Sequence, residues 1–260
     1  MRILFIGDVV AAPGRHILEK HLGRLQREYN IDFTIVNGEN SSGGFGMNKK
    51  AYNEMTDLGV DAFTMGNHIW DNKDIFNFID QDTKIVRPAN FPSNLPGAPW
   101  RIFDVQGQKI AITNVVGRVY MPPAECPYAA VDAIITQVRQ LTPLVIVDIH
   151  AEATSEKMAM GWYLDGRVSA VLGTHTHVQT NDARILPKGT AYISDAGMTG
   201  PRDSVLGMDK DIIVKKFTTG MPVRFEIATG DLQFNAVVFE VDANGRALSI
   251  ETINFFEPAI

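Results

Sequence analysis

The order of secondary-structure signals in the first 80 residues constrains the fold more than any other feature of the sequence. Short runs rich in β-branched and aromatic residues alternate with segments whose apolar residues recur at helical spacing. The expected elements are strand Arg2–Ile6, helix Pro13–Tyr29, strand Asp32–Val36, helix Asn48–Leu58, strand Asp61–Met65 and helix Asn72–Ile79. This β-α-β-α-β-α alternation predicts parallel strands joined by helical crossovers.

The rest of the chain predicts a second group of strands. Three prolines mark a loop at Phe91–Pro99, and a hairpin with its turn at Gln106–Gln108 follows. Beyond it we expect a helix at Tyr128–Leu141, strands at Leu144–Ile149 and Val168–Leu172, and then mainly strands: Tyr192–Ile193, Leu232–Val241 and Ala247–Phe255. Because no linker or internal repeat interrupts the chain, we expect one domain spanning residues 1–260, with two sheets and flanking helices.

Composition narrows the classes of function. The 260 residues include 24 Lys and Arg against 30 Asp and Glu, a net charge of −6 that argues against a broad basic surface for duplex nucleic acid. Cys126 is the only cysteine, so no intramolecular disulfide can form. The apolar run Ile3–Ile6 is too short for a signal peptide, and no run reaches the ~18 residues of a membrane span. We therefore expect a cytoplasmic protein without membrane contact.

Residues of metal-ligating type follow five of the predicted strands. In parallel α/β sheets, functional sites form beyond the carboxyl ends of the strands. The five segments are Gly7-Asp8, Asn37-Gly38-Glu39-Asn40, Gly66-Asn67-His68, Asp148-Ile149-His150 and Gly173-Thr174-His175-Thr176-His177. Each segment alone would be an ordinary turn or helix cap. Five segments with the same chemistry at one edge predict a metal site.

The candidate ligands are too many for one closed zinc site, which takes four ligands, mostly Cys and His. They are Asp8, Glu39, Asn40, Asn67, His150, His175 and His177. Carboxylates, amides and imidazoles without a thiolate suit two ions about 3.5–4 Å apart, with Glu39 as the bridge. We expect His175 and His177 to face the same way, because side chains two residues apart in extended chain do so.

Two loops are expected to lie near this site. The glycine-rich segment Ser41–Gly46 lacks the Gly-x-Gly-x-x-Gly spacing of a dinucleotide site, so we expect it to let the chain pass close to metal or substrate. The segment Ser194–Asp209 contains three glycines and is expected to shape either the pocket or an oligomer interface.

Taken together, the five segments resemble the calcineurin-like metallophosphoesterases. The longer strings Gly7–Arg15, Asn37–Gly44, Gly66–Asp71, Asp148–Lys157 and Gly173–Thr180 are more closely similar to the YmdB-like branch of bacterial phosphodiesterases that act on cyclic nucleotides. The resemblance implies an α/β fold, a four-layer αββα sandwich of two mixed β-sheets flanked by helices. It also implies one metal ion held by Asp8, Glu39, Asn40 and His177, a second held by Glu39, Asn67, His150 and His175, and His68 as the proton donor.

The sequence departs from the wider superfamily at three positions. Val10 stands where the usual Asp-x-His motif has its histidine, so one metal loses a nitrogen ligand unless Asn40 substitutes for it. Glu39 stands where the bridging residue is usually Asp. Ile69 replaces the acidic residue that often follows the donor histidine, which leaves Asp71 as the nearest carboxylate in sequence to His68.

The resemblance implies an enzyme, a metal-dependent phosphodiesterase that hydrolyses 2′,3′-cyclic nucleotides with the 2′ oxygen as leaving group. Its cofactors would be two divalent or mixed-valence ions, with iron or manganese favoured over zinc. Three alternatives stay open: a phosphomonoesterase, an RNase, and a regulator that senses nucleotides or RNA at the metal site without turnover. RNA as a partner and assembly into a homo-oligomer also stay open.

Overall fold

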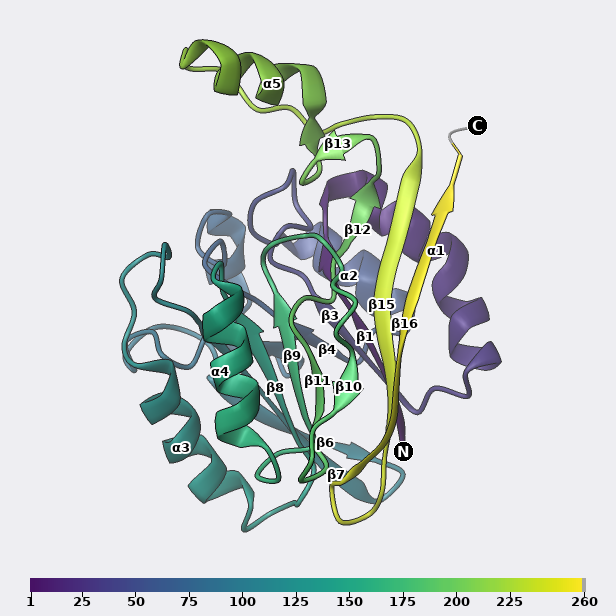
Figure 1. The fold of residues 1–260 in the computed structure, drawn as a ribbon, viewed down its shortest axis with the longest axis vertical. Helices are drawn as coiled ribbons and strands as arrows, with labels where there is room; N and C mark the ends of the chain where they lie inside the picture. The colour runs from purple at the N-terminus through teal and green to yellow at the C-terminus, as the bar shows by residue number, and fades with distance from the viewer. Residues whose placement is uncertain (259–260) are drawn as a thin grey trace.

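The computed structural model describes residues 1–258, in which two β-sheets pack face to face between two pairs of helices (Figure 1). The first sheet contains β1 (Arg2–Ile6), β2 (Asp8–Val9), β3 (Phe33–Asn37), β4 (Ala62–Thr64), β5 (Ile85–Val86), β12 (Met198–Pro201), β15 (Leu232–Val241) and β16 (Ala247–Glu257). The second contains β6 (Trp100–Val105), β7 (Gln108–Val116), β8 (Val145–His150), β9 (Ala170–Thr174), β10 (Arg184–Ile185) and β11 (Ala191–Ile193). The predicted four-layer αββα fold is confirmed.

Both sheets are mixed, because each combines a run of parallel strands with strands that pair antiparallel to it. In the first sheet β1, β3, β4 and β5 run parallel, and β15 pairs antiparallel to β1. In the second sheet β7, β8, β9 and β11 run parallel, with β6 and β10 antiparallel at the two edges. The predicted hairpin at residues 102–116 is the β6–β7 pair.

The central strands are buried on both faces, which explains their continuous apolar sequence. In β1, Ile3 and Phe5 point into the core between the two sheets, whereas Leu4 and Ile6 point into the core beneath the helices. Side chains alternate between the faces of a strand, so one short strand contributes to two hydrophobic layers.

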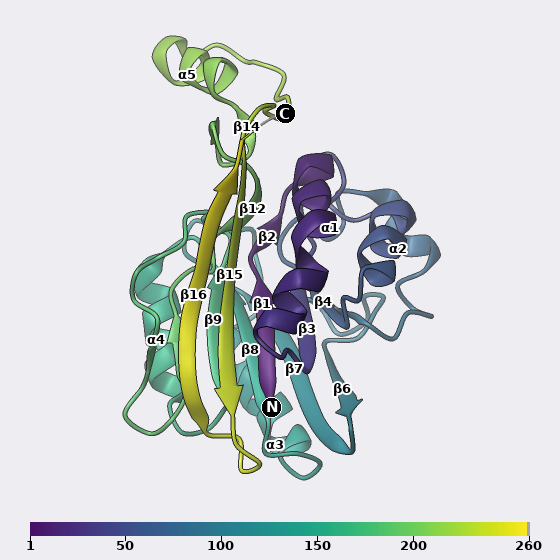
Figure 2. The same ribbon diagram turned by 90° about the vertical axis from the view of Figure 1, so that its right-hand side faces the viewer.

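Four helices cover the outer faces of the sheets. Helices α1 (Ala11–Glu28) and α2 (Lys49–Asp57) lie on the first sheet, and α3 (Pro127–Val138) and α4 (Thr154–Leu164) lie on the second (Figure 2). Helix α2 begins where predicted, because the Asn48 side chain accepts a hydrogen bond from the Ala51 N–H at 2.8 Å. Among residues 1–258, no helix has the length and apolar character needed to cross a membrane.

Several sequence expectations need correction. The segment expected as a helix at Asn72–Ile79 contains only a short 3-10 helix at Lys73–Asn77. Helix α4 was not predicted, and the tail described as mainly strands also contains helix α5 (Lys210–Thr219). Within the expected loop Ser194–Asp209 lie β12, β13 (Ser204–Val205) and β14 (Met208–Asp209). The elements β13, β14 and α5 form an arm that projects from one end of the sheets (Figures 1 and 2).

Candidate metal centre

The carboxyl ends of β1, β3 and β4 meet those of β8 and β9 at one end of the two sheets. A buried polar contact joins the sheets there: Asn37 Nδ2, at the end of β3, donates to Asp148 Oδ2 of β8 at 3.2 Å. The seven predicted ligands lie around this junction in two overlapping groups.

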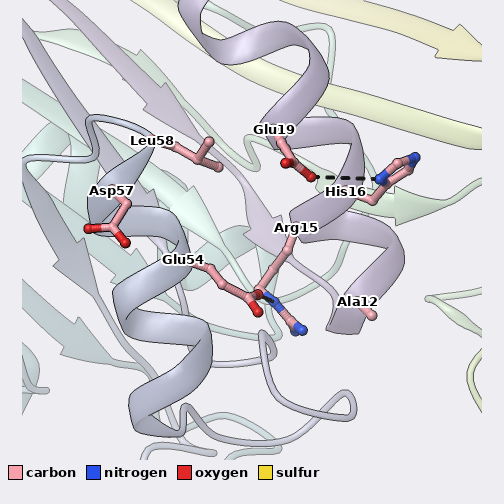
Figure 3. A pocket seen from close by; sticks show the side chains of 7 residues that line it. All are labelled: Ala12, Arg15, His16, Glu19, Glu54, Asp57 and Leu58. Carbon is pink, nitrogen blue, oxygen red and sulfur yellow. Dashed lines mark hydrogen bonds and ion pairs between the residues drawn. The ribbon is translucent and has the colours of Figure 1, made fainter.

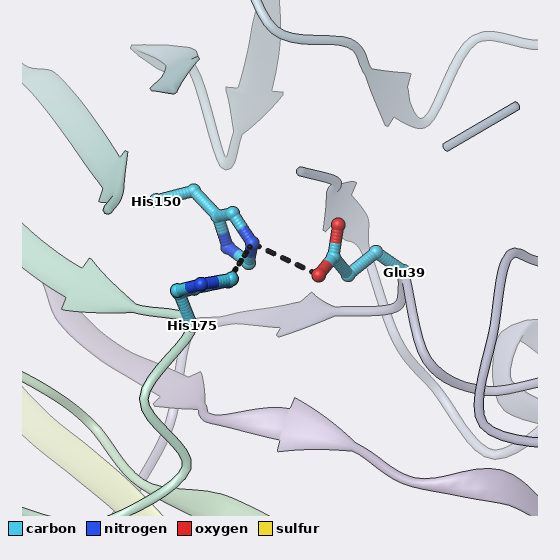
Figure 4. A group of neighbouring side chains, drawn as sticks. All are labelled: Glu39, His150 and His175. Carbon is cyan, nitrogen blue, oxygen red and sulfur yellow. Dashed lines mark hydrogen bonds and ion pairs between the residues drawn. The ribbon is translucent and has the colours of Figure 1, made fainter. Parts of the chain in front are cut away.

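The first group is compact and is centred on His150, the last residue of β8. Its Nε2 atom lies 2.9 Å from Glu39 Oε1 and 3.0 Å from His175 Nδ1 (Figure 4). The same atom lies 3.0 Å from Asn67 Oδ1. Glu39, His150 and His175 offer ligand atoms that all lie within 4.8 Å of one another. We call these three residues and Asn67 the His150 group.

The second group surrounds the side-chain amide of Asn40. Asn40 Nδ2 lies 3.2 Å from Asp8 Oδ1, 3.1 Å from His177 Nε2 and 3.4 Å from Glu39 Oε1. His177 Nε2 and Asp8 Oδ1 are themselves 3.7 Å apart. We call Asp8, Glu39, Asn40 and His177 the Asp8 group.

A single carboxylate oxygen joins the two groups. Glu39 Oε1 contacts both His150 Nε2 and Asn40 Nδ2, while Glu39 Oε2 accepts a hydrogen bond from the His68 backbone N–H at 3.0 Å. The fold brings Glu39 this close because residue 66 is glycine. A Cβ atom on Gly66 would lie 2.3 Å from Glu39 Oε2 and 2.4 Å from His150 Nε2.

The donor atoms fit metal ions. Asp8, Glu39 and His150 are fully buried, and buried carboxylates in this setting need cationic partners. The Asn40 amide donor occupies the point on which carboxylate and imidazole acceptors converge, which is where a cation would bind. A half-turn of that amide would present Oδ1 there instead of Nδ2, and an amide oxygen can bind a cation.

Residues behind the ligands orient their rings. Thr174 Oγ1 donates to Asp148 Oδ1 at 2.7 Å and therefore accepts from His150 Nδ1–H at 2.8 Å, which leaves His150 Nε2 free to bind a metal. His175 Nε2 pairs with the Glu152 carboxylate at 3.3 Å, so its Nδ1 faces the centre. No sequence pattern pointed to Thr174 or Glu152 in these roles, and Asp148 was included only as part of the strand-end segment Asp148-Ile149-His150.

The expectation that His175 and His177 lie in extended chain is wrong. Strand β9 ends at Thr174, and His175 and His177 have φ angles of 100° and 63°, in the left-handed region. Asp195 fixes Thr176, which lies between the two histidines, because the N–H and the hydroxyl of Thr176 both donate to Asp195 Oδ2, at 3.0 and 2.6 Å. This turn points each imidazole at a different ligand group.

Asp195 is itself fixed by a buried ion pair that sequence reasoning missed. The Lys157 ammonium lies 2.6 Å from Asp195 Oδ2, and both side chains are almost completely buried. Lys157 ends the string Asp148–Lys157 that carries the family resemblance, but it comes from α4, the helix that was not predicted, so no sequence pattern indicated its ion pair with Asp195.

The ionisable ligands strongly influence each other's pKa values. Burial works against ionisation of Asp8 and Glu39, but neighbouring histidines hold the pKa of each carboxyl below its ordinary value. Burial likewise opposes the charge on His150, yet the Glu39 carboxylate raises the pKa of His150 to about 9. Burial and the adjacent His150 charge lower the pKa of His175 to about 3. Without a cation, His150 therefore carries the positive charge that Glu39 requires.

His68 lies beside both groups but presents its side chain differently. Its Nδ1–H donates to the Asp71 carboxylate at 2.7 Å, so Asp71 does reach His68. The side chain is 29% exposed, and Nε2 has no hydrogen-bond partner within the described part of the chain. His68 thus offers one free ring nitrogen at the rim of the candidate centre.

A surface cavity of about 390 Å³ between α1 and α2 has a different character. It is lined by Ala12, Arg15, His16, Glu19, Glu54, Asp57 and Leu58 (Figure 3). Arg15 pairs with Glu54 at 2.6 Å and His16 lies 3.9 Å from Glu19, so these charges are already partnered. None of the seven candidate metal ligands lines this cavity.

Comparison with known proteins identifies the family. Residues 4–253 match the YmdB-like proteins, and the chain belongs to that family. A 2′,3′-cyclic-nucleotide 2′-phosphodiesterase of Bacillus subtilis (strain 168) is 51% identical over 254 residues, which cover 97% of this chain and 96% of the relative. The chain is therefore a homologue of a phosphodiesterase.

Two solved structures share the fold over nearly their whole length. A hypothetical protein from Thermus thermophilus is 41% identical with a TM-score of 0.94, covering 99% of this chain and 100% of that one. A phosphatase from Mycoplasma pneumoniae is 37% identical with a TM-score of 0.94, covering 99% and 94%. These matches confirm the resemblance that the sequence motifs indicated.

Proposed function

We propose that this protein is a metal-dependent phosphodiesterase that hydrolyses 2′,3′-cyclic nucleotides by breaking the bond between phosphorus and the 2′ oxygen. The observation that carries the proposal is the overlap of two ligand groups at Glu39 Oε1, with the free Nε2 of His68 at their rim. The phosphodiesterase activity of the B. subtilis relative supplies the substrate class. We also propose that residues 1–260 form one domain, since both sheets contribute to the core between them.

The His150 group would hold one ion and the Asp8 group the other. Their nitrogen and oxygen donors, without a thiolate, favour iron or manganese and also allow zinc. A pair of such ions, when bound, activates water and neutralises the charge that develops on the phosphate. Glu39, whose Oε1 belongs to both groups, would be a ligand to both ions.

His68 is assigned as the general acid. The imidazolium form donates its Nε2 proton to the 2′ oxygen as the bond to phosphorus breaks, and Asp71 holds the ring through Nδ1. The backbone of His68 is fixed by its N–H bond to Glu39, so the acid and the bridging ligand keep a constant spacing.

Product analysis tests the proposal. Protein loaded with manganese is incubated with 2′,3′-cyclic AMP, and the products are separated by chromatography. We expect 3′-AMP to form only with metal present, and Glu39→Gln protein to form none. Production of 2′-AMP would reassign the leaving oxygen. Turnover only of terminal phosphates or of linear RNA would identify a phosphomonoesterase or an RNase, and nucleotide binding without turnover would identify a regulator.

A further inference from the structure

An exposed aromatic ring lies directly beside the proposed general acid. Phe45 belongs to the glycine-rich segment Ser41–Gly46, and its ring centroid is 5.0 Å from that of His68, with an angle of 69° between the planes. Phe45 is 38% exposed, so the contact with His68 leaves a large part of its ring open to solvent.

The segment that carries Phe45 has a defined shape. The Ser42 N–H donates to the Gly46 carbonyl at 3.0 Å and closes the loop, and Arg15 of α1 donates to the Ser41 carbonyl. Glycines permit the close packing on either side of Phe45. A Cβ on Gly44 would lie 2.9 Å from the side chains of Met208, in β14, and Ile227, and one on Gly46 would lie 2.6 Å from Asn72.

The chemistry of the proposed reaction determines what lies next to His68. The oxygen of a water molecule adds to phosphorus as the water releases a proton to solvent, the bond from phosphorus to the 2′ oxygen breaks, and that oxygen takes the proton from His68. The 2′ oxygen is bonded to the ribose carbon adjacent to the one that bears the base. A substrate whose 2′ oxygen is at His68 therefore places its base within reach of the same rim.

We propose that Phe45 forms a stacking platform for the nucleobase of the substrate. This inference rests on the proposed function. Stacking on an aromatic face tolerates every base, because each base has a π-face, and larger bases gain more contact. Trp70 also lies near His68 in sequence, but it already stacks on Phe76 with centroids 5.2 Å apart and planes at 9°. The open ring beside the acid is that of Phe45.

The test compares Phe45→Leu and Phe45→Trp with the unaltered protein on two substrates: 2′,3′-cyclic AMP, and methyl riboside 2′,3′-cyclic phosphate, which undergoes the same reaction without a base. Phe45→Leu should raise KM for cyclic AMP by roughly 5- to 150-fold with kcat little changed. The base-free substrate should be unaffected, and Phe45→Trp should keep the preference for cyclic AMP. Phe76→Leu serves as the matched control, since its ring packs on Trp70, and should behave as unaltered protein.

Two results would overturn the proposal. An equal loss on both substrates would show that Phe45 acts on His68 and not on the base. Unchanged constants for Phe45→Leu on cyclic AMP would show that no stacking occurs.

A binding measurement separates this proposal from the proposed function. Calorimetric titration of the manganese-loaded protein compares 3′-AMP with ribose 3-phosphate. We expect tighter binding of 3′-AMP and loss of that difference in Phe45→Leu. Should the protein turn over no cyclic phosphate, the proposed function fails, and the platform is still upheld or refuted by whether Phe45→Leu removes the difference between the two ligands.

Discussion

The His150 group and the Asp8 group share Glu39, but the fold restrains the side chains of the His150 group more tightly than those of the Asp8 group. His150 is the fully buried end of a central strand, with three ligand atoms at 2.9–3.0 Å and a hydroxyl fixing its outer nitrogen. In the Asp8 group, His177 lies 3.7 Å from Asp8, and its Nδ1 is held at 3.1 Å by the carbonyl of Leu206. Leu206 lies in the turn between β13 and β14 and is 47% exposed.

This difference between the two groups predicts that they bind metal ions with different affinities. The His150 group supplies two imidazoles, from His150 and His175, whereas the Asp8 group supplies one, from His177, and has Val10 rather than a histidine two residues after Asp8. Val10 is buried and packs with Ala11 and Met198, so the fold uses this position for packing. We expect the His150 group to bind the tighter ion and the Asp8 group the exchangeable one.

The largest effect is expected from Glu39→Gln, because Glu39 Oε1 belongs to both groups. Removing the shared charge should displace metal from both positions and reduce the rate by about 10³-fold or more, a loss of several kcal/mol of transition-state stabilisation. Metal analysis together with the initial rate measures the effect, and thermal unfolding checks that the fold persists. A Glu39→Gln protein that is fully active and binds two ions would show that Glu39 is not a ligand shared by the two groups.

His68→Ala tests a residue that belongs to neither group. It should keep both ions and lose roughly 10²–10⁴-fold in rate on 2′,3′-cyclic AMP, because the leaving 2′ oxygen is no longer protonated. The loss should shrink on a nitrophenyl phosphodiester, whose leaving group needs little protonation. Equal losses on the two substrates would indicate that His68 positions the phosphate, and loss of metal would make it a ligand.

Thr174→Val tests the firmness of the His150 group alone. The substitution keeps the volume but removes the hydroxyl that links His150 Nδ1 to Asp148, so affinity for the tighter ion should fall about 10- to 100-fold. The matched control is Thr113→Val, a buried threonine of β7 whose hydroxyl bonds to the Pro99 carbonyl instead. Competition with a metal chelator measures the metal affinity of both variants. Equal metal affinities of the Thr174→Val and Thr113→Val proteins would contradict the role given to Thr174 in the His150 group.

The smallest effect is the one expected from a change of a single pH unit. A protonated imidazole cannot bind metal, and the pKa of metal-free His150 is raised to about 9 by Glu39. Metal must therefore displace a proton, and its apparent affinity should rise with pH towards 9, by up to about tenfold per unit for each proton displaced. Burial raises the pKa of Asp148 to about 7, so the support through Thr174 is fully ionised only above that pH. Metal affinity measured from pH 6 to 9 that stays constant would contradict this coupling.

Sequence reasoning succeeded where chemistry follows a strand directly. The alternation of strands and helices, and the glycines at the strand ends, located the stretch of chain that carries each candidate ligand. It failed where tertiary contacts decide the backbone. The left-handed turn at His175 and His177 depends on Asp195 and Lys157, which lie far from it in sequence. The weakly amphipathic α4 and the arm, whose helix buries only Ile213 among the described residues, had no clear periodic signal.

Metal stoichiometry measured against activity tests the central claim most directly. Metal-free protein is titrated with manganese while bound metal and phosphodiesterase rate are followed together. Two overlapping ligand groups of unequal firmness predict two ions per chain, the first bound tightly with little activity and the second restoring the rate. His177→Ala should keep the first ion and lose the second. Full activity with one ion per chain would contradict the account.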